Sequence, residues 1–512
     1  MPRPLYLISL TVLVLGALLL RLPNLGNRPM HGDESVHALK FKELWEKGTY
    51  HYDANEFHGP TPYYAALPVI RLLGRHSFVE TREADYRLVP VLAGVGLLLL
   101  LGLLGDALGR KPILWAALLT AVSPAMVFYS RYYIQEMLFA CFLLGLIACG
   151  WRYSRSHRVG WVIGAGAFAG LVIASKETSV INFAALGMAL AHTVPRKAWG
   201  VRRGHLLLGA GVALVVACLF LSGFLTNLAG PVDYLRSYAP WFGRAKGVGL
   251  HRHPWDWYLS LLAWHHSAKG PWWSEGLILA LAAVGLVVAL TRRKPGPEEA
   301  QPSFARFLAL YTVLLTAAYS AIPYKTPWCV LSFLDGMVLL GGIGAAALVA
   351  APKARWARTV VAVLLLAGCG QLAAQAYRTS FVYEADARNP YVYAQTVPEI
   401  NALQKRVEEL AAASPEGDNL LIKVYSVDGY YWPLPWTLRR FHNVGYWTAL
   451  PADAAAPVVI ASPEFDEELT KRLDATHLMT GFYGIRPGVL LQLWVRMDVW
   501  EAYLKKRGPA AE

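Results

Sequence analysis

The chain has 512 residues, of which 55% are hydrophobic and only 16% are charged. Soluble proteins carry roughly 25% charged residues, so this composition excludes an ordinary soluble protein and indicates a membrane protein. The formal net charge is +13, but the Lys and Arg residues form short clusters between apolar runs, where the positive-inside rule places them. We therefore expect no nucleic-acid partner. The five cysteines form no CxxC pair and lie in or beside apolar runs, which predicts buried free thiols.

Apolar runs long enough to cross a bilayer recur through the first 377 residues. They predict a polytopic α-helical membrane domain over residues 1–377. The eleven expected spans are 4–23, 86–108, 112–130, 134–151, 159–175, 178–194, 204–226, 274–291, 304–322, 328–350 and 357–376.

The loops between these spans alternate in charge, with basic clusters in every second loop. The clusters lie at 110–111, 152–158, 196–203, 292–294 and 353–358. Because the positive-inside rule places such loops in the cytoplasm, we predict a multi-pass protein of the cytoplasmic (inner) membrane with a cytoplasmic N-terminus. Loops 24–85 and 227–273 and the residues after 377 are then expected to lie outside.

The first outward loop, 24–85, is unusually polar for a segment that follows a span. It contains "MHGDESVHALKFKELWEKGTYHYDANEFHGPTPYY", with the adjacent acids Asp33 and Glu34 and four histidines. Residues 35–47 have apolar and charged residues at helical spacing, which predicts a surface helix. The apolar segment 61–76 is too short to span and is expected to lie along the outer interface or dip into it.

Three further outward turns each carry a single basic residue next to acids or prolines: "SRYYIQE", "SKETS" and "IPYKTPW". A charge at the bilayer centre costs about 3 kcal/mol or more, so these side chains are expected near the interface or in a wet cavity. One such residue could be an interfacial anchor, but the set is better explained by a shared polar cavity at the outer leaflet. The charged residues of these turns are Arg131, Glu136, Lys176, Glu177 and Lys325.

From about residue 378 the pattern changes to alternating helix and strand signals. They predict one small extracytoplasmic α/β domain over 378–512. Helices are expected at 396–414 and 464–473, and strands at 419–426, 456–462 and 488–496. The most unusual piece is a loop crowded with aromatic residues, "VDGYYWPLPWTLRRFHNVGYW" at 427–447.

Acids and bases at one membrane face suit chemistry on an anionic substrate. A carboxylate such as Asp33 can act as general base towards a hydroxyl, and Lys or Arg can neutralise a phosphate leaving group. A divalent metal could do the same. Asp33 and His37 are four residues apart, so a helix that begins early would place both on one face, where they could hold such a metal.

Five segments in chain order resemble a known family: "RPMHGDESVHA", "YHYDANEFHGPTPYY", "SRYYIQE", "IPYKTPW" and "YWPLPWTLRR". An outward loop with Asp-Glu after the first span is similar to the GT-C superfamily of integral-membrane glycosyltransferases. That superfamily includes protein O-mannosyltransferases and aminoarabinose transferases. Together the five segments most resemble its prokaryotic flippase-activity-associated family, over nearly the whole chain.

The resemblance implies an inverting transfer of a hexosyl or pentosyl group from a polyprenyl-phosphate donor in the outer leaflet. The acceptor would be a hydroxyl of a glycan, lipid or protein, deprotonated by Asp33, with Glu34 as the second member of the catalytic pair. The basic residues expected to face the lipid phosphate are Lys325, Arg131 and Lys176. The residues expected to support the site are Glu136, which follows Gln135 in place of the acid pair of many relatives, His58 and Glu177.

Two other classes stay open at this stage. One is a non-catalytic transporter or flippase-associated protein for lipid-linked glycans, and the other is a scaffold whose outer domain recruits partners. A transporter more often carries ionisable residues near the midplane, on broken helices of two related halves. Here the ionisable residues gather at one face and the halves show no repeat, so we rank the enzyme first.

Overall fold

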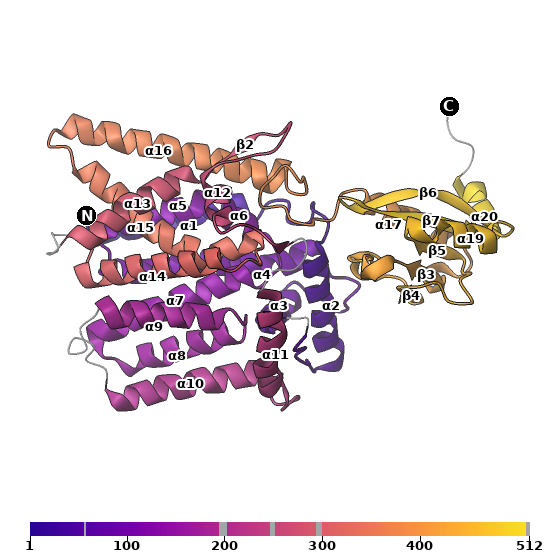
Figure 1. Ribbon diagram of the computed structural model, residues 1–512, viewed down its shortest axis with the longest axis horizontal. Coiled ribbons are helices and arrows are strands. Elements are labelled where there is room, and N and C mark those ends of the chain that lie inside the picture. Colours follow the sequence, from indigo (N-terminus) through magenta and orange to yellow (C-terminus); the bar gives the residue numbers. More distant parts are fainter. Residues whose placement is uncertain (56–57, 194–201, 246–250, 293–299, 508–512) are drawn as a thin grey trace.

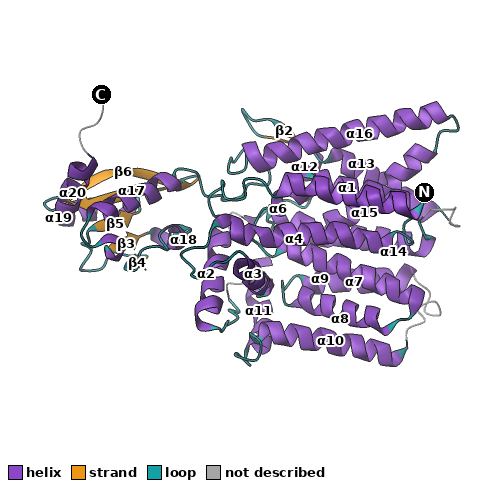
Figure 2. Ribbon diagram, turned by 180° about the vertical axis from the view of Figure 1, so that it is seen from behind, coloured by secondary structure: helices purple, strands orange, loops and turns teal. Residues whose placement is uncertain are grey.

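The computed structural model describes residues 1–55, 58–193, 202–245, 251–292 and 300–507. It has two parts, a helical bundle and a smaller C-terminal domain with a sheet, joined by an extended linker (Figures 1 and 2). The predicted basic residues at 196–201 and 293–294 lie outside the described residues.

Each of the eleven predicted spans coincides with one helix or with two consecutive helices. Seven helical segments of the described chain are long and apolar enough to cross a membrane, and α8, α9 and α13 are shorter apolar helices. The third predicted span is broken between α5 and α6 at Ser123, so the total of eleven stays a prediction. The bundle helices are α1 Arg3–Arg21, α4 Glu83–Leu101, α5 Arg110–Val122, α6 Pro124–Tyr129, α7 Glu136–Ser156, α8 Val159–Ile173, α9 Ser179–Thr193, α10 Arg203–Leu221, α13 Gly276–Thr291, α14 Pro302–Ala321, α15 Leu331–Ala350 and α16 Arg355–Tyr377.

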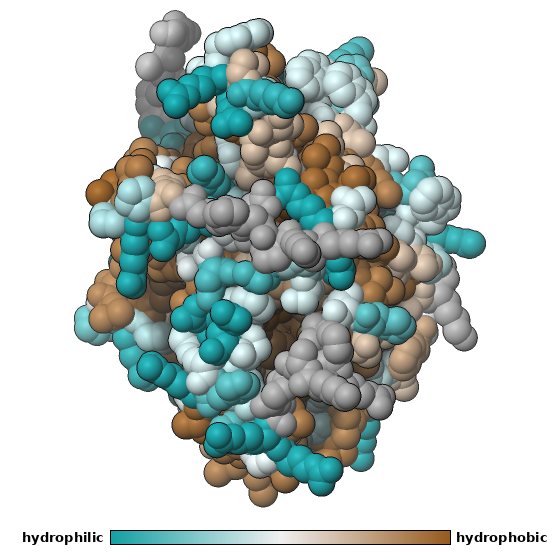
Figure 3. Space-filling model, turned by 90° about the vertical axis from the view of Figure 1, so that its left-hand side faces the viewer, coloured by the Kyte–Doolittle hydropathy of each residue, from teal (hydrophilic) through white to brown (hydrophobic). Residues whose placement is uncertain are grey.

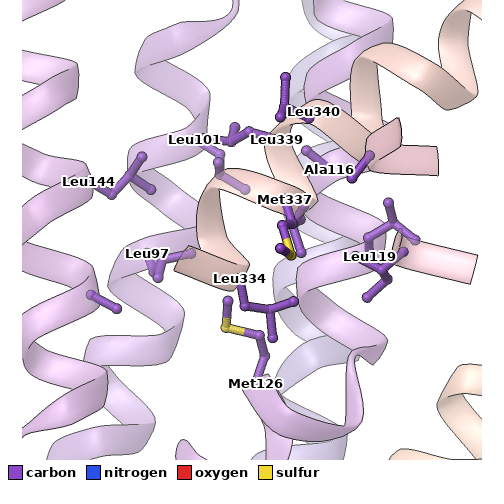
Figure 4. Close-up of a cluster of buried hydrophobic side chains, with 14 of the residues drawn as sticks. Leu97, Leu101, Ala116, Leu119, Met126, Leu144, Leu334, Met337, Leu339 and Leu340 are labelled. Carbon is purple, nitrogen blue, oxygen red and sulfur yellow. The ribbon is translucent and has the colours of Figure 1, made fainter. Parts of the chain in front are cut away.

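Helix α15 lies at the centre of the bundle and packs against α5, α7, α13 and α14. Small residues allow the close approach: a Cβ atom on Gly285 would lie 1.9 Å from the carbonyl oxygen of Leu340. Side chains from α4, α5, α6, α7 and α15 interdigitate in the buried core (Figure 4). This core positions the outward ends of the helices, where the predicted charged turns lie.

The two ends of the bundle differ in character. The N-terminus lies at the end away from the C-terminal domain (Figure 1). That end is covered by many hydrophilic side chains, with hydrophobic surface between and around them (Figure 3). The predicted separation of the N-terminus and the C-terminal domain onto opposite ends is thus present in the fold.

Cysteine labelling tests which end faces the cytoplasm. Ser156→Cys at the end of α7 and Asn419→Cys in the C-terminal domain both place a thiol at an exposed position. We expect an impermeant maleimide to label Asn419→Cys on intact cells and Ser156→Cys only after lysis, because basic loops stay in the cytoplasm. The unmodified chain gives the background from its own thiols. Labelling of Asn419→Cys only after lysis would reverse the assigned orientation.

Short helices cover the end of the bundle nearest the C-terminal domain (Figures 1 and 2). The surface helix predicted in the first loop is present as α2, which begins three residues earlier than expected, and the apolar segment 61–76 contains helix α3. Loop 227–273 holds two helices and a small hairpin that its composition did not predict. The elements are α2 Gly32–Lys47, α3 Thr61–Leu72, α11 Gly230–Ala245, α12 Trp257–Ala263, β1 His265–His266 and β2 Trp272–Trp273.

The C-terminal domain has a five-stranded sheet in the order β4-β3-β5-β7-β6. Strand β3 pairs parallel with β4 and β5, and β7 pairs antiparallel with β5 and β6. The three predicted strands and two predicted helices are confirmed, whereas β4, β6, α18 and α20 were not predicted. The elements are α17 Ile400–Ala413, β3 Ile422–Tyr425, α18 Leu434–Thr437, β4 Val444–Trp447, β5 Val458–Ala461, α19 Asp466–Leu473, β6 His477–Arg486, β7 Val489–Arg496 and α20 Met497–Arg507.

The linker between the two parts is held against the bundle. The hydroxyl of Tyr391 donates to the buried carboxylate of Glu275 at the start of α13 (2.6 Å). The hydroxyl of Thr396 donates to the carbonyl of Met30 (2.6 Å), in the loop that leads into α2. The C-terminal domain is therefore attached close to the segment that carries Asp33.

Candidate active site

A cavity of about 590 Å³ lies where the outward turns meet α2 and α11. It brings together residues from seven separate segments of the chain, between Asp33 and Cys329. Of the nine residues proposed for the site from the sequence, six line this cavity and three do not. The six are Asp33, His37, His58, Glu136, Lys176 and Glu177. The shared polar cavity expected from the charged turns is therefore present.

Asp33 lies in the first turn of α2, and its side chain is 52% exposed. The neighbouring His31 caps the helix and fixes this turn. Its Nδ1 accepts the amide of Asp33 (3.0 Å), and its Nε2 donates to the carbonyl of Tyr393 in the linker (2.9 Å). Burial lowers the pKa of His31, in keeping with a neutral ring that both donates and accepts. Asp33 is thus held in place by a residue that the sequence did not single out.

The prediction that Glu34 is the second member of a catalytic pair is not supported. Its side chain points away from the cavity and is completely buried. Its carboxylate accepts two bonds from the Arg87 guanidinium (2.7 and 2.8 Å) and one from Arg28 (3.2 Å). The amides of His31 (3.0 Å) and Tyr133 (2.8 Å) also donate to it. Burial raises the pKa of Glu34, but the two guanidinium charges outweigh it and hold the pKa far below its usual range. This acid has a structural role in binding the loop to the bundle.

Glu136 and Lys176 form a buried ion pair on the cavity wall. The Lys176 ammonium lies 2.8 Å from Glu136 Oε1 and 3.4 Å from the sulfur of Cys329, which also lines the cavity. The other carboxylate oxygen, Oε2, has no hydrogen-bond partner among the described residues. The pair therefore places an oriented ammonium beside the cavity.

His58 and Glu177 form a second pair on the wall. His58 Nδ1 lies 2.6 Å from Glu177 Oε2, and the hydroxyl of Tyr52 donates to the other carboxylate oxygen. The His58 ring stacks on Trp241 of α11, with ring centres 4.7 Å apart. One turn along α11, Arg244 also lines the cavity, and its guanidinium lies over the Trp241 ring (4.6 Å).

Trp241 and Arg244 were not predicted as site residues, because their segment was expected only to be part of the outward loop 227–273. The stretch "DYLRSYAPWFGR" carries the signal that could have found them. Its apolar residues recur three and four positions apart, as in an amphipathic helix. An arginine near the end of such a helix, at the same face as the other charges, is a candidate phosphate ligand.

Lys325 and Arg131 are not brought to the cavity. The Lys325 ammonium donates to the carbonyls of Ser320 (2.9 Å) and Ile322, and only 1% of the residue is exposed. Burial lowers the pKa of this ammonium. Arg131 donates to the carbonyls of Arg21 (2.9 Å) and Pro23 (2.6 Å), closing the end of α1. These contacts do not support a phosphate-binding role for either residue, since their donors are already used by the backbone.

Asp33 and His37 both line the cavity, as a shared metal site would require. However, His37 Nδ1 is hydrogen-bonded with the hydroxyl of Tyr63 (2.9 Å). Within the described ranges, no group of three or more His, Cys, Asp or Glu side chains is placed to hold a metal ion. Catalytic metals such as zinc usually have three protein ligands, so the described donor set does not fit one and we assign no catalytic step to a metal.

Residues 68–222 match the family model for dolichyl-phosphate-mannose-protein mannosyltransferases. A search among curated proteins finds no match. Among solved structures, the fold is similar to that of ArnT from Cupriavidus metallidurans, bound to undecaprenyl phosphate (TM-score 0.64) and in the apo state (0.65). In both cases the identity is 16%, over 94% of this chain and 97% of the other.

The Archaeoglobus fulgidus oligosaccharyltransferase in its apo form is also similar, with a TM-score of 0.57 and 12% identity over 98% of this chain and 77% of that chain. These likenesses confirm the superfamily resemblance at the level of the fold. The narrower resemblance to the flippase-activity-associated family stays a prediction. The chain therefore has the GT-C fold of integral-membrane glycosyltransferases.

Proposed function

We propose that the protein is a glycosyltransferase that acts at the outer face of the cytoplasmic membrane and moves a sugar from a polyprenyl-phosphate donor to an acceptor hydroxyl. The observation that carries the proposal is the distribution of charge around one cavity. The half-exposed carboxylate of Asp33 lies at its mouth, and the cations of Lys176 and Arg244 line the same space. The similar ArnT structure contains undecaprenyl phosphate, which supports this class of donor.

The proposed reaction is a single displacement with inversion. Asp33 takes the proton of the acceptor hydroxyl as its oxygen forms a bond to the anomeric carbon. The bond between that carbon and the phosphate oxygen breaks on the opposite side, and polyprenyl phosphate leaves with the bonding electrons. Lys176 and Arg244 neutralise the charge that develops on the phosphate. Glu136 keeps the Lys176 ammonium oriented through their 2.8 Å ion pair.

Incubation of the purified protein with defined polyprenyl-phosphate sugars tests this function. Release of polyprenyl phosphate is expected with at least one sugar, and it should increase when membrane extract from the source cells is added as acceptor. Transport of intact lipid-linked sugar without any release would favour the transporter instead. The assay reports the bond that breaks, so it does not depend on knowing the acceptor.

Lys176→Met is expected to raise the donor KM by about 10- to 100-fold, since a hydrogen bond to a charged group contributes about 1.5–3 kcal/mol. Lys325→Met is the matched control, because it removes an ammonium that the structure does not bring to the cavity. Its donor KM should stay unchanged. The donor titration is measured for both, with thermal unfolding as a check on folding.

Removal of Lys176 leaves Glu136 without its ion-pair partner, so Arg244→Met is a second test of the same assignment. Arg244 lies at the cavity on a surface helix, and its loss should also raise the donor KM. An increased KM in Lys325→Met together with normal values in the other two variants would restore the phosphate role first expected for Lys325.

A further inference from the structure

The aromatic loop that the sequence singled out, 427–447, lies against the segment that carries Asp33. A Cβ atom on Gly32, the residue before Asp33, would lie 3.8 Å from the Cβ atom of Trp432. The loop is also attached to the bundle, because the indole nitrogen of Trp436 donates to Glu83 at the start of α4 (2.8 Å). Aromatic side chains of the C-terminal domain are thus fixed beside the base.

Arg486, at the end of β6, belongs to a second part of the C-terminal domain that is attached near the loop before α2. The linker amide of Val397 donates to the carbonyl of Ile485 (2.8 Å), next to the point where Thr396 bonds the loop before α2. Burial lowers the pKa of Arg486, while the charges of Tyr430 and Asp33 act in the opposite direction. Its guanidinium carbon lies 5.1 Å from the centre of the Tyr430 ring.

These side chains have binding capacity that the fold does not use. In the described part of the chain, neither the Arg486 guanidinium nor the Trp432 indole nitrogen has a hydrogen-bond partner. The Tyr430 side chain is 46% exposed. By contrast, Trp436 and Arg439 of the same loop donate to Glu83 and to the carbonyl of Thr81. Tyr430, Trp432 and Arg486 are therefore not required to attach the C-terminal domain to the bundle.

The chemistry of this cluster suits a carbohydrate. The apolar C–H face of a sugar ring packs on the negative face of an aromatic ring, and the ring hydroxyls accept from indole, phenol and guanidinium donors. Asp33 lines the cavity on the bundle side, Trp432 of the C-terminal domain approaches the neighbouring Gly32, and Arg486 lies over the ring of Tyr430 in the same loop. An acceptor held on this side and a donor held in the cavity would meet at the carboxylate.

Building on the function proposed above, we propose that Tyr430, Trp432 and Arg486 bind the acceptor and that the acceptor is a carbohydrate. The aromatic loop is then the part of the C-terminal domain that selects the substrate. Its anchors, Trp436 and Arg439, hold it in position without contacting the acceptor.

A binding experiment on the full chain in lipid nanodiscs tests the proposal. The labelled protein is applied to an array of neutral oligosaccharides, oligosaccharides containing uronic acids, and unglycosylated peptides. We expect it to bind oligosaccharides, and Trp432→Ala and Arg486→Gln to weaken the strongest interaction by about tenfold or more. Phe482→Ala removes an exposed aromatic ring from the same strand as Arg486 and should bind as the unmodified chain does.

Two further measurements separate this proposal from the proposed function. Asp33→Asn should still bind the oligosaccharide, because binding does not need the base. Trp432→Ala should raise the acceptor concentration that gives half-maximal release of polyprenyl phosphate. Binding of peptides only, no binding to any oligosaccharide, or normal binding by both variants would overturn the acceptor site. Tyr430→Ala, at an exposed position, decides the question if Trp432→Ala fails to fold.

Discussion

Replacing Asp33 with asparagine is expected to lower the rate of sugar transfer by about 10²–10⁴-fold, the usual contribution of a general base. The amide keeps the size of the side chain but cannot take the proton of the acceptor hydroxyl. Donor binding should stay normal, because the cations assigned to the phosphate are Lys176 and Arg244. Single-turnover release of polyprenyl phosphate measures the chemical step, and a donor titration measures binding.

Asp53→Asn is the matched control for this variant. Asp53 lies in the same outward loop but does not line the cavity, and its carboxylate accepts the amide of Asn55 (2.9 Å). Its transfer rate should remain close to normal. A near-normal rate in Asp33→Asn would remove the base assignment and leave His37, His58, Glu136 and Glu177 as candidate bases at the cavity.

Replacing Glu34 with glutamine is expected to destabilise the protein by about 3–5 kcal/mol, because it leaves buried charges without their partner. The side chain is fully buried and binds the guanidinium groups of Arg87 and Arg28. The pKa of Glu34 is held far below its usual range, so its stabilising effect is complete above the ordinary carboxyl pKa of about 4.3. It should be lost only as the pH falls through the lowered pKa of the folded state.

Thermal unfolding in detergent measures this loss. Glu43→Gln, at a partly exposed position of the same helix, removes surface ion pairs with Lys40 and Lys47 and should change stability by about 1 kcal/mol or less. If Glu34→Gln unfolds normally and yet loses transfer activity, Glu34 takes part in the chemistry, as the Asp-Glu pair first indicated.

The bundle could be predicted from the sequence because an apolar run of about 20 residues identifies a span without knowledge of its neighbours. Strand β6 was missed for the opposite reason. Its sequence "HLMTGFYGIR" mixes polar, small and aromatic residues without alternation. The strand depends on pairing with β7 through a register interrupted by irregularities, and such long-range pairing leaves no local pattern.

The site could be predicted only as far as the cavity. Three charged turns on one face indicated a common polar space, but not which atoms enter it. Asp33 and Glu34 are adjacent, and successive helix residues are rotated by about 100°, so one faces the cavity and the other the bundle. Lys325 has the residue type of a phosphate ligand, but its ammonium donates to nearby carbonyls. No sequence pattern predicts which acceptor a lysine side chain will bind.

The contacts around His31 also determine when the segment that carries Asp33 can reach its final structure during synthesis. His31 receives its orienting carbonyl from Tyr393, 362 positions later, and Thr396 bonds Met30 across 366 positions. At a synthesis rate of about 5–20 residues per second, roughly 20–70 seconds separate these partners on the ribosome. During that time the first helix and the loop that follows it are already made, but the contacts that hold Asp33 in position cannot yet form. The segment that carries Asp33 is therefore completed only when the linker has been synthesised.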